Sequence, residues 1–160
     1  MHRLTGLLFA ALLAFSAAPA FAMDILVLRH AEKASGAGSD PGLALAGQER
    51  AARVAGRFRP DVVYATRYRR AIETARPAAE AAGVVVRIYD PSRPDELIAK
   101  ICALPADSRV LVVGHSNTVP PLVQQLSGLA VEEMPESEYD RWMLVHIDGN
   151  GRASLQIDRY

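Results

Sequence analysis

Four short, mostly apolar runs recur along the chain, and each ends where polar residues begin. They span residues 25–28, 61–64, 84–89 and 110–113. Runs of this length, rich in β-branched residues and bounded by polar residues or glycine, are typical of strands in a sheet. We therefore expect four strands between residues 25 and 113.

Helical patterns lie between and after these strands. Apolar or small residues recur at helical spacing over 44–58, 70–82, 95–103 and 120–127. Gly83 follows the second of these segments and suits the position after a helix C-terminus. Strands that alternate with helices predict an α/β fold of three layers, with a mostly parallel sheet and helices on both faces.

The chain is expected to close with a β-hairpin. Residues 142–147 and 153–157 have strand patterns and flank the turn sequence Asp-Gly-Asn-Gly at 148–151. This hairpin would give the sheet an antiparallel edge. The acidic stretch over 132–140 precedes it and is interpreted as a solvated connection.

The first 22 residues have a different character from the rest. They combine a short basic start, an apolar stretch over 7–15 and the small-residue end Ala20-Phe21-Ala22. This pattern is typical of a cleaved secretory signal, and the apolar stretch is short for a membrane span. We predict export to a bacterial periplasm or the exterior, with a single mature domain over 23–160; an uncleaved anchor is the alternative.

Charge and cysteine content exclude several classes of function. Because Arg3 leaves with the signal, the mature chain carries 17 Lys and Arg residues against 18 Asp and Glu residues. That balance gives no sign of bulk binding to nucleic acid or to an acidic membrane surface, and no stable membrane span is expected after cleavage. The single Cys102 allows no internal disulfide and is interpreted as a buried small apolar residue.

Cationic side chains gather where three of the predicted strands end. Arg29 and His30 follow the first strand, Arg67 and Arg70 follow the second, and His115 follows the fourth. In open α/β sheets, ligands bind outside the carboxyl ends of the strands. Arginine offers forked donors that match phosphate oxygens, and a protonated histidine adds another donor. The sequence therefore predicts an anion pocket suited to a phosphoryl group.

A histidine in such a pocket has further chemical possibilities. An imidazole can attack phosphorus and divide hydrolysis into the formation and breakdown of a phosphohistidine. A metal site is an alternative, but only Glu32 lies beside His30 as a further ligand type. A serine triad at Ser116 lacks the Gly-x-Ser-x-Gly elbow.

Three segments resemble the histidine phosphatase superfamily, whose fold is that of the phosphoglycerate mutases. Residues 29–33 (Arg-His-Ala-Glu-Lys) resemble its Arg-His-Gly/Ala signature, and residues 66–75 are similar to its Ser-x-x-x-Arg-Ala-x-x-Thr-Ala segment. Residues 113–118 (Val-Gly-His-Ser-Asn-Thr) resemble its second-histidine motif. Thr66 stands where the family usually has Ser, and Ala44 stands where a Thr often begins the following helix.

The resemblance implies a role for each matching residue. His30 would be the nucleophile, and Arg29, Arg70 and His115 would bind the phosphoryl group. No metal ion and no organic cofactor would be required.

The general acid is the least defined part of this expected site. In many relatives it is a carboxylate that follows the third strand, and here Asp90, Asp95 and Glu96 lie in that stretch. A donor must lie within hydrogen-bond reach of the leaving oxygen. We predict Asp90, although Asp90 could equally be a turn residue and Asp95 a helix cap.

Four further residues are candidates for substrate binding. Lys33, Arg67 and Asn117 could extend the anion pocket, and Glu32 could either join it or pair with a nearby cation.

Together these features predict an exported, cofactor-independent phosphatase of the histidine acid phosphatase type, which hydrolyses a phosphomonoester through phospho-His30. The substrate could be a phosphorylated small molecule, an envelope glycan or a phosphoprotein, and the oligomeric state stays open. One alternative is a phosphate-binding module without a competent acid. Another is a mutase, although the chain is short for that branch and a mutase must exclude water.

Overall fold

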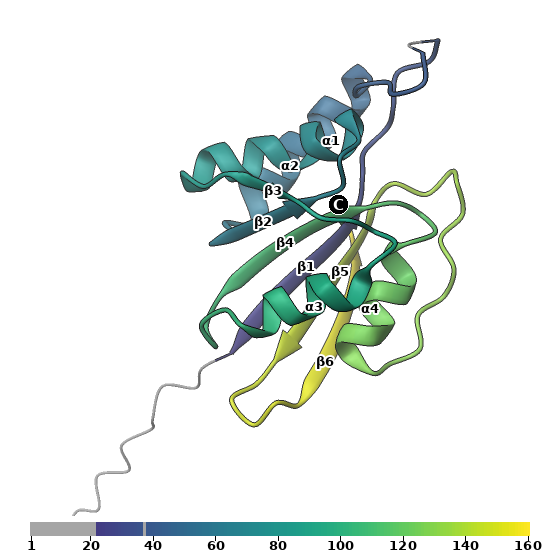
Figure 1. Ribbon diagram of the computed structural model, residues 1–160. Helices are drawn as coiled ribbons and strands as arrows, with labels where there is room; N and C mark the ends of the chain where they lie inside the picture. The colour runs from purple at the N-terminus through teal and green to yellow at the C-terminus, as the bar shows by residue number, and fades with distance from the viewer. Residues whose placement is uncertain (1–21, 37) are drawn as a thin grey trace, which may run out of the picture.

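The computed structural model describes residues 22–36 and 38–160, so the predicted signal lies outside the described residues except for Ala22. Within them, the strands form one sheet in the order β3-β2-β4-β1-β5-β6 (Figure 1). The strands are β1 (Met23–Arg29), β2 (Val62–Ala65), β3 (Val86–Ile88), β4 (Arg109–Gly114), β5 (Arg141–Ile147) and β6 (Ala153–Arg159).

The pairing of the strands brings three of their ends together. Strand β4 lies between β1 and β2 and is parallel to both, with Arg29 opposite Gly114 and Ala65 opposite Val113. The carboxyl ends of β1, β2 and β4 are therefore level. Strands β5 and β6 pair antiparallel, which confirms the predicted hairpin at the edge of a mostly parallel sheet.

Helices cover both faces of the sheet, so the predicted three-layer α/β fold is confirmed (Figure 1). The helices are α1 (Leu45–Arg57), α2 (Arg69–Ala82), α3 (Pro94–Cys102) and α4 (Val119–Ser127). Helices α1 and α2 pack on one face of the sheet, and α3 and α4 pack on the other.

Strand β1 supplies the core of both layers. Leu26 and Leu28 pack in the cluster that holds Val54 of α1, whereas Ile25 and Val27 pack in the opposite cluster. The side chains of these four residues of β1 are fully buried, and each contributes about 1.5–3 kcal/mol relative to an exposed position. The apolar run is continuous because helices lie on both sides of it.

The ends of the helices agree only in part with the sequence. Gly83 ends α2 in the left-handed conformation, with φ 73°, as predicted. Helix α3 begins with Pro94 after Arg93, so Asp95 lies in its first turn and its interpretation as a helix cap was wrong. The prediction of a buried Cys102 was also wrong. Leu97 and Ile101 form the buried stripe of α3, and Cys102 is rotated about 100° away from it.

The acidic stretch is solvated as predicted, since Glu132, Glu133 and Glu136 are exposed, but it is also anchored to the protein by Arg141. The Arg141 side chain, only 8% exposed, donates from Nη1 to the carbonyl of Glu132 at 2.9 Å and from Nη2 to that of Glu133 at 3.2 Å. It also forms two hydrogen bonds with the carboxylate of Glu138, at 2.6 and 2.7 Å. These contacts fix the segment that leads into β5.

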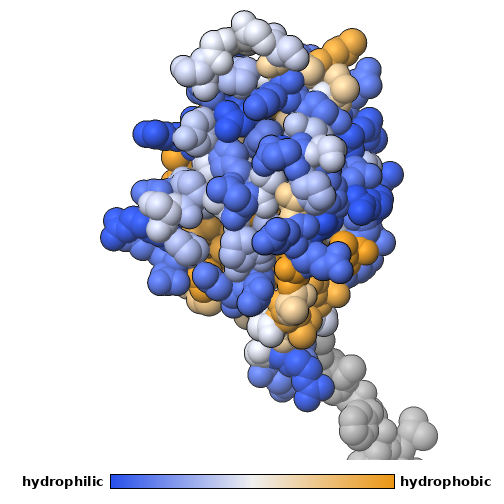
Figure 2. Space-filling model, turned by 90° about the vertical axis from the view of Figure 1, so that its right-hand side faces the viewer, coloured by the Kyte–Doolittle hydropathy of each residue, from blue (hydrophilic) through white to orange (hydrophobic). Residues whose placement is uncertain are grey.

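The surface is largely hydrophilic on the face shown in Figure 2, where apolar residues form small separate groups. Among the residues that the structure describes, the exposed large apolar side chains are Leu45, Val85, Ile88, Leu129 and Ile157. Across residues 22–36 and 38–160, no helix has the length and apolar character needed to cross a membrane.

Candidate active site

The level ends of β1, β2 and β4 open into a cavity of about 300 Å³. Its lining comprises Arg29, His30, Lys33, Tyr68, Arg70, Pro91, His115, Ser116, Asn117, Thr118 and Glu136. Residues from all three predicted motifs therefore meet in one place. The backbone supports this arrangement, because His30 N donates to Gly114 O at 2.9 Å.

His30 is buried and held in one tautomer. Its Nδ1 lies 2.8 Å from the carbonyl oxygen of Ala31, which can only accept, so Nδ1 carries the proton. Its Nε2 lies 3.1 Å from Nε of Arg70, which can only donate, so Nε2 presents its lone pair. Helix α2 also fixes this loop, since Thr74 Oγ1 accepts from Ala31 N at 2.9 Å.

Arg70 is positioned by three neighbours. Besides its contact with His30, its Nη1 lies 3.7 Å from Oδ1 of Asp40, and its guanidinium lies 4.6 Å from the centre of the Tyr68 ring. Asp40 also accepts from the backbone N of Arg69 at 3.1 Å. Asp40 was not anticipated from the sequence, because it lies in a loop with no motif.

His115 faces His30 across the cavity. The two ring centres lie 5.2 Å apart in an edge-to-face arrangement, and the Tyr68 ring packs on His115 with centres 5.1 Å apart. His115 Nε2 and Thr66 Oγ1 form a hydrogen bond of 2.9 Å. Thr66 therefore supplies a hydroxyl at the position where the family usually has Ser.

Burial and the cationic surroundings make both histidines poor bases toward protons. Burial, together with the charges of Arg70 and Arg29, lowers the pKa of His30 and of His115 to about 4. Both imidazoles are therefore neutral near pH 7, and the protonated histidine expected from the sequence is absent from this state. A phosphoryl dianion in the cavity would raise the pKa of His115 and restore the expected charge.

The guanidinium of Arg29 donates several hydrogen bonds to other residues of the protein. Its side chain is 2% exposed, and its Nη1 donates to the carbonyls of Pro135, Glu136 and Glu138 at 3.1, 2.8 and 2.8 Å. Its guanidinium also lies 4.1 Å from the centre of the Tyr139 ring. Arg29 lines the cavity, so it combines a position beside His30 with the anchoring of the 135–138 segment.

Glu136 is a second residue of the site that the sequence did not single out. One carboxylate oxygen accepts from Arg29 Nη2 at 2.7 Å, and the other accepts from the hydroxyl of Ser116, next to His115. The hydrogen bond from Ser116 and the charge of Arg29 lower the pKa of Glu136. No local signal distinguishes Glu136 from its acidic neighbours, although its partner Ser116 lies within a motif.

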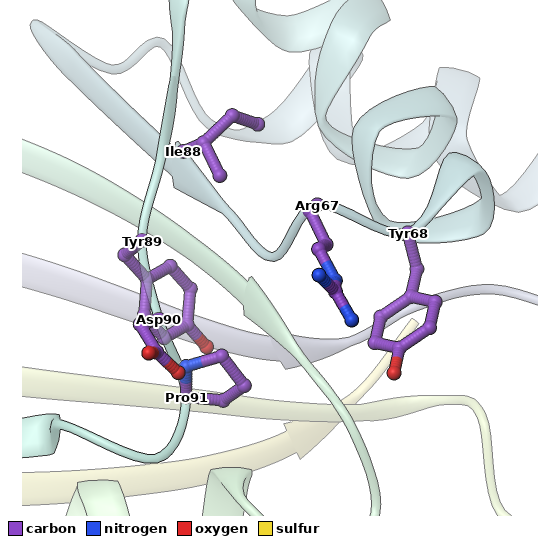
Figure 3. Close-up of a pocket in the computed structure, with 6 residues that line it drawn as sticks. All are labelled: Arg67, Tyr68, Ile88, Tyr89, Asp90 and Pro91. Atoms are coloured by element: carbon purple, nitrogen blue, oxygen red, sulfur yellow. The ribbon is translucent and has the colours of Figure 1, made fainter.

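Asp90 lies in a neighbouring cavity of about 390 Å³, shown in Figure 3. There the side chains of Arg67 and Tyr68 face those of Tyr89, Asp90 and Pro91 (Figure 3). Tyr68 and Pro91 line both cavities, so the two are contiguous.

The three candidate acids do not line the His30 cavity. Asp90 accepts from the hydroxyl and the backbone N of Ser92 at 2.7 and 2.9 Å, and these bonds lower its pKa. Glu96 is paired with Arg93, and Asp95 lies in the first turn of α3. The structure thus brings none of the three beside His30.

The predicted substrate-binding residues divide into two groups. Lys33 and Asn117 line the His30 cavity, and Arg67 lines the neighbouring one. Glu32 lines neither, because its carboxylate is held by Arg50 through hydrogen bonds of 2.6 to 3.1 Å. Of the two possibilities for Glu32, the structure shows the pairing with a nearby cation.

The chemistry of the cavity is that of an anion site. Three cationic side chains and two imidazoles surround it, against one carboxylate from the described residues. Within residues 22–36 and 38–160, no group of three or more His, Cys, Asp or Glu side chains is placed to hold a metal ion.

Comparison with known proteins agrees with this geometry. The model of the histidine phosphatase superfamily, branch 1, matches residues 25–92, which include Arg29, His30 and Arg70. The predicted resemblance to the histidine phosphatase superfamily is confirmed. No functionally curated protein was found to match the chain.

Several solved structures resemble this chain over most of their length and have the histidine phosphatase fold. The protein histidine phosphatase SixA, complexed with tungstate, is 18% identical with a TM-score of 0.68, and the match covers 86% of this chain and 97% of SixA. A mycobacterial glucosyl-3-phosphoglycerate phosphatase is 19% identical with a TM-score of 0.63, covering 87% and 98%. A putative α-ribazole-5′-P phosphatase from Escherichia coli is 16% identical with a TM-score of 0.66, covering 86% and 96%.

Proposed function

We propose that this protein is an exported phosphatase that hydrolyses a phosphomonoester through a phosphohistidine on His30. The observation that carries the proposal is the lone pair of His30 Nε2, which points to Arg70 in a cavity lined by further cations. A nucleophile beside a preorganised set of cations is the arrangement that phosphoryl transfer needs.

The proposed reaction has two steps. The guanidinium of Arg70 moves its donors from Nε2 to the phosphoryl oxygens, and His30 Nε2 attacks phosphorus. The bond from phosphorus to the leaving oxygen breaks with its electron pair on that oxygen, which takes a proton from solvent. Water then attacks the phosphorus of phospho-His30, the P–N bond breaks, and inorganic phosphate leaves. The dianion raises the pKa of His115, which takes a proton from solvent and then holds the phosphoryl oxygens in both steps.

The rest of the substrate is proposed to occupy the cavity of Figure 3, which is continuous with the His30 cavity through Tyr68 and Pro91. Arg67 and the aromatic rings there would contact a polar leaving group. The similar structures are named for a phosphorylated protein residue and for two phosphorylated small molecules. We accordingly propose a phosphorylated small molecule, envelope glycan or phosphoprotein as substrate.

Export rests on the signal pattern of residues 1–22. Strand β1 begins at Met23, so cleavage after Ala22 would leave the whole sheet intact. Expression of the full chain in a bacterium, followed by sequencing of the mature N-terminus, tests this point. A mature chain that begins at Met23 is expected, whereas retention of the first residues in the membrane fraction would indicate an anchor.

The decisive experiment measures hydrolysis of an aryl phosphate by wild type, His30→Ala and His146→Ala, with quenching in alkali to preserve phosphohistidine. His146 is exposed on β5, so its variant controls for loss of a histidine. Activity and phosphoenzyme should vanish only in His30→Ala. Full activity of His30→Ala would overturn the nucleophile.

A second candidate, a phosphate-binding module, is favoured by the position of Asp90 outside the His30 cavity. Binding of inorganic phosphate without turnover of any phosphomonoester would support that function instead.

A further inference from the structure

One acidic side chain lies in the wall of an otherwise cationic cavity. Among the described residues that line the cavity, Glu136 is the only one with a carboxylate. A carboxylate beside an anion site weakens the binding of a phosphoryl dianion by like-charge repulsion. A carboxylate that opposes binding of the phosphoryl group is therefore a candidate for a role in the reaction.

The carboxylate is held in place from two directions. Arg29 fixes one oxygen at 2.7 Å, and Ser116 fixes the other through its hydroxyl. Arg29 also binds the backbone carbonyl of Glu136 at 2.8 Å, so a buried guanidinium holds both the main chain and the side chain of this residue. Glu136 therefore has a defined location in the wall beside His115.

The same carboxylate is open to water. Its side chain is 80% exposed, whereas Arg29 is 2% exposed and His30 is 4% exposed. The carboxylate of Glu136 is therefore accessible to water, whereas the His30 side chain is buried. The pKa of Glu136 is lowered, so the carboxylate is ionised near pH 7 and can accept a proton.

We propose that Glu136 is the general base that accepts a proton from the water that hydrolyses phospho-His30. This inference rests on the proposed function, because it concerns the second step of that reaction. The water oxygen forms a bond to phosphorus, one water proton passes to the Glu136 carboxylate, and the P–N bond breaks with its electron pair returning to Nε2. Release of inorganic phosphate and loss of the proton to solvent return Glu136 to its ionised form.

The proposal separates the two steps experimentally. An aryl phosphate carries a leaving group that departs with little protonation, so the first step should proceed without Glu136. The second step, by contrast, needs the base. Removal of the base should therefore let phospho-His30 form and then persist.

The test compares wild type with Glu136→Gln and with Glu133→Gln. Glutamine keeps acceptor and donor groups for Arg29 and Ser116 but cannot take up the proton. Glu133 lies three residues away on the same segment and does not line the His30 cavity, so its variant is a matched control. Thermal unfolding of all three proteins checks that the segment remains folded.

The expected result is a burst of about one aryl product per molecule of Glu136→Gln, followed by turnover about 10²-fold or more below wild type. Alkaline quenching should show phospho-His30 accumulating in Glu136→Gln, with wild-type behaviour in Glu133→Gln. Unchanged turnover of Glu136→Gln would overturn the proposal. Slow turnover without a burst or phosphoenzyme would also overturn it, since the first step would then be the impaired one.

Failure of the proposed function gives a different result. In that case wild type forms no phosphoenzyme, or His30→Ala remains active. Formation of phospho-His30 in wild type, together with rapid hydrolysis by Glu136→Gln, would leave the phosphatase proposal intact and remove the role of Glu136 alone.

Discussion

Nε of Arg70 donates a hydrogen bond to Nε2 of His30 at 3.1 Å, so the lone pair of the proposed nucleophile faces the proposed phosphate ligand. Residues 40 positions apart meet here because β1 and β2 flank the same central strand. A phosphoryl group that enters between them can take the guanidinium donors and expose the lone pair. Binding of the phosphoryl group by Arg70 and exposure of the His30 lone pair therefore depend on the same contact.

Replacement of Arg70 by Lys tests this coupling. Lysine keeps the charge but lacks the planar fork, so it cannot bind two phosphoryl oxygens in the same way. Loss of a charged hydrogen bond of about 1.5–3 kcal/mol corresponds to a decrease of roughly 10- to 150-fold in kcat/KM for an aryl phosphate. The matched control is Arg69→Lys, because Arg69 is 64% exposed and pairs with Glu73 outside the His30 cavity. Equal effects of the two substitutions would contradict the proposed role of Arg70.

The pH dependence of stability tests the burial of His30. Its pKa in the folded protein is lowered to about 4 from an unfolded value near 6.5, so the unfolded chain takes up the proton first as the pH falls. The stability linked to this difference is present above pH 6.5 and is lost between pH 6.5 and 4. It amounts to about 3 kcal/mol.

Urea unfolding of wild type and His30→Asn between pH 7 and 4 measures this effect. Asparagine has no charge to gain over that range. The free energy of unfolding of wild type should therefore fall by about 3 kcal/mol more than that of the variant. Parallel curves for the two proteins would show that His30 does not carry this linkage.

Arg29 is expected to be a structural anchor as well as part of the cavity. Lysine is shorter and lacks the planar guanidinium, so it cannot reproduce the partly buried hydrogen bonds to the three carbonyls of residues 135–138. Arg29→Lys should lower the free energy of unfolding by about 3 kcal/mol and accelerate hydrogen exchange in residues 135–139.

The control for Arg29 is Arg159→Lys. Arg159 pairs with Glu138 and Asp140 from a position that is 62% exposed, and such surface pairs contribute at most about 1 kcal/mol. Exchange rates of the 135–139 segment that stay at the wild-type level in Arg29→Lys would show that other contacts hold this segment.

Two glycines of α1 allow a matched test of packing beside the His30 loop. A Cβ added at Gly47 would collide with the backbone oxygen of Glu32 and lie 3.0 Å from its backbone nitrogen, whereas one added at Gly56 meets nothing within 4 Å. Gly47→Ala should destabilise the protein by about 1–3 kcal/mol and reduce activity, because Glu32 follows His30 and Ala31. Gly56→Ala should stabilise it by about 0.5–1 kcal/mol. Chemical denaturation of both variants checks the sign of each change.

The layers of the fold and the main site residues could be predicted from local sequence. Continuous apolar runs such as 25–28 are typical of strands covered on both faces, and Gly83 marks a helix end through its own backbone preference. Because parallel strands end at the same edge of the sheet, the residues after β1, β2 and β4 had to meet. His30, Arg70 and His115 accordingly line one cavity, as their positions after these strands predict.

Other features depend on contacts between segments far apart in the chain. The carboxylate of Glu136 reaches the cavity because Arg29, 107 residues earlier, binds both its side chain and its backbone. Glu133 and Glu136 are the same residue type in the same acidic stretch, so no local sequence pattern distinguishes one from the other. Likewise, Glu32 is removed from the cavity by Arg50, and Asp40 joins the site through Arg70.

The sequence by itself thus determined the layers, the strand ends and the cations that gather there, since these follow from periodicity and chain direction. The tertiary structure alone decided which carboxylate lies in the cavity, which histidine nitrogen carries the proton, and how far each pKa moves. These properties depend on distance, burial and partner geometry, and such quantities exist only once remote segments have packed together.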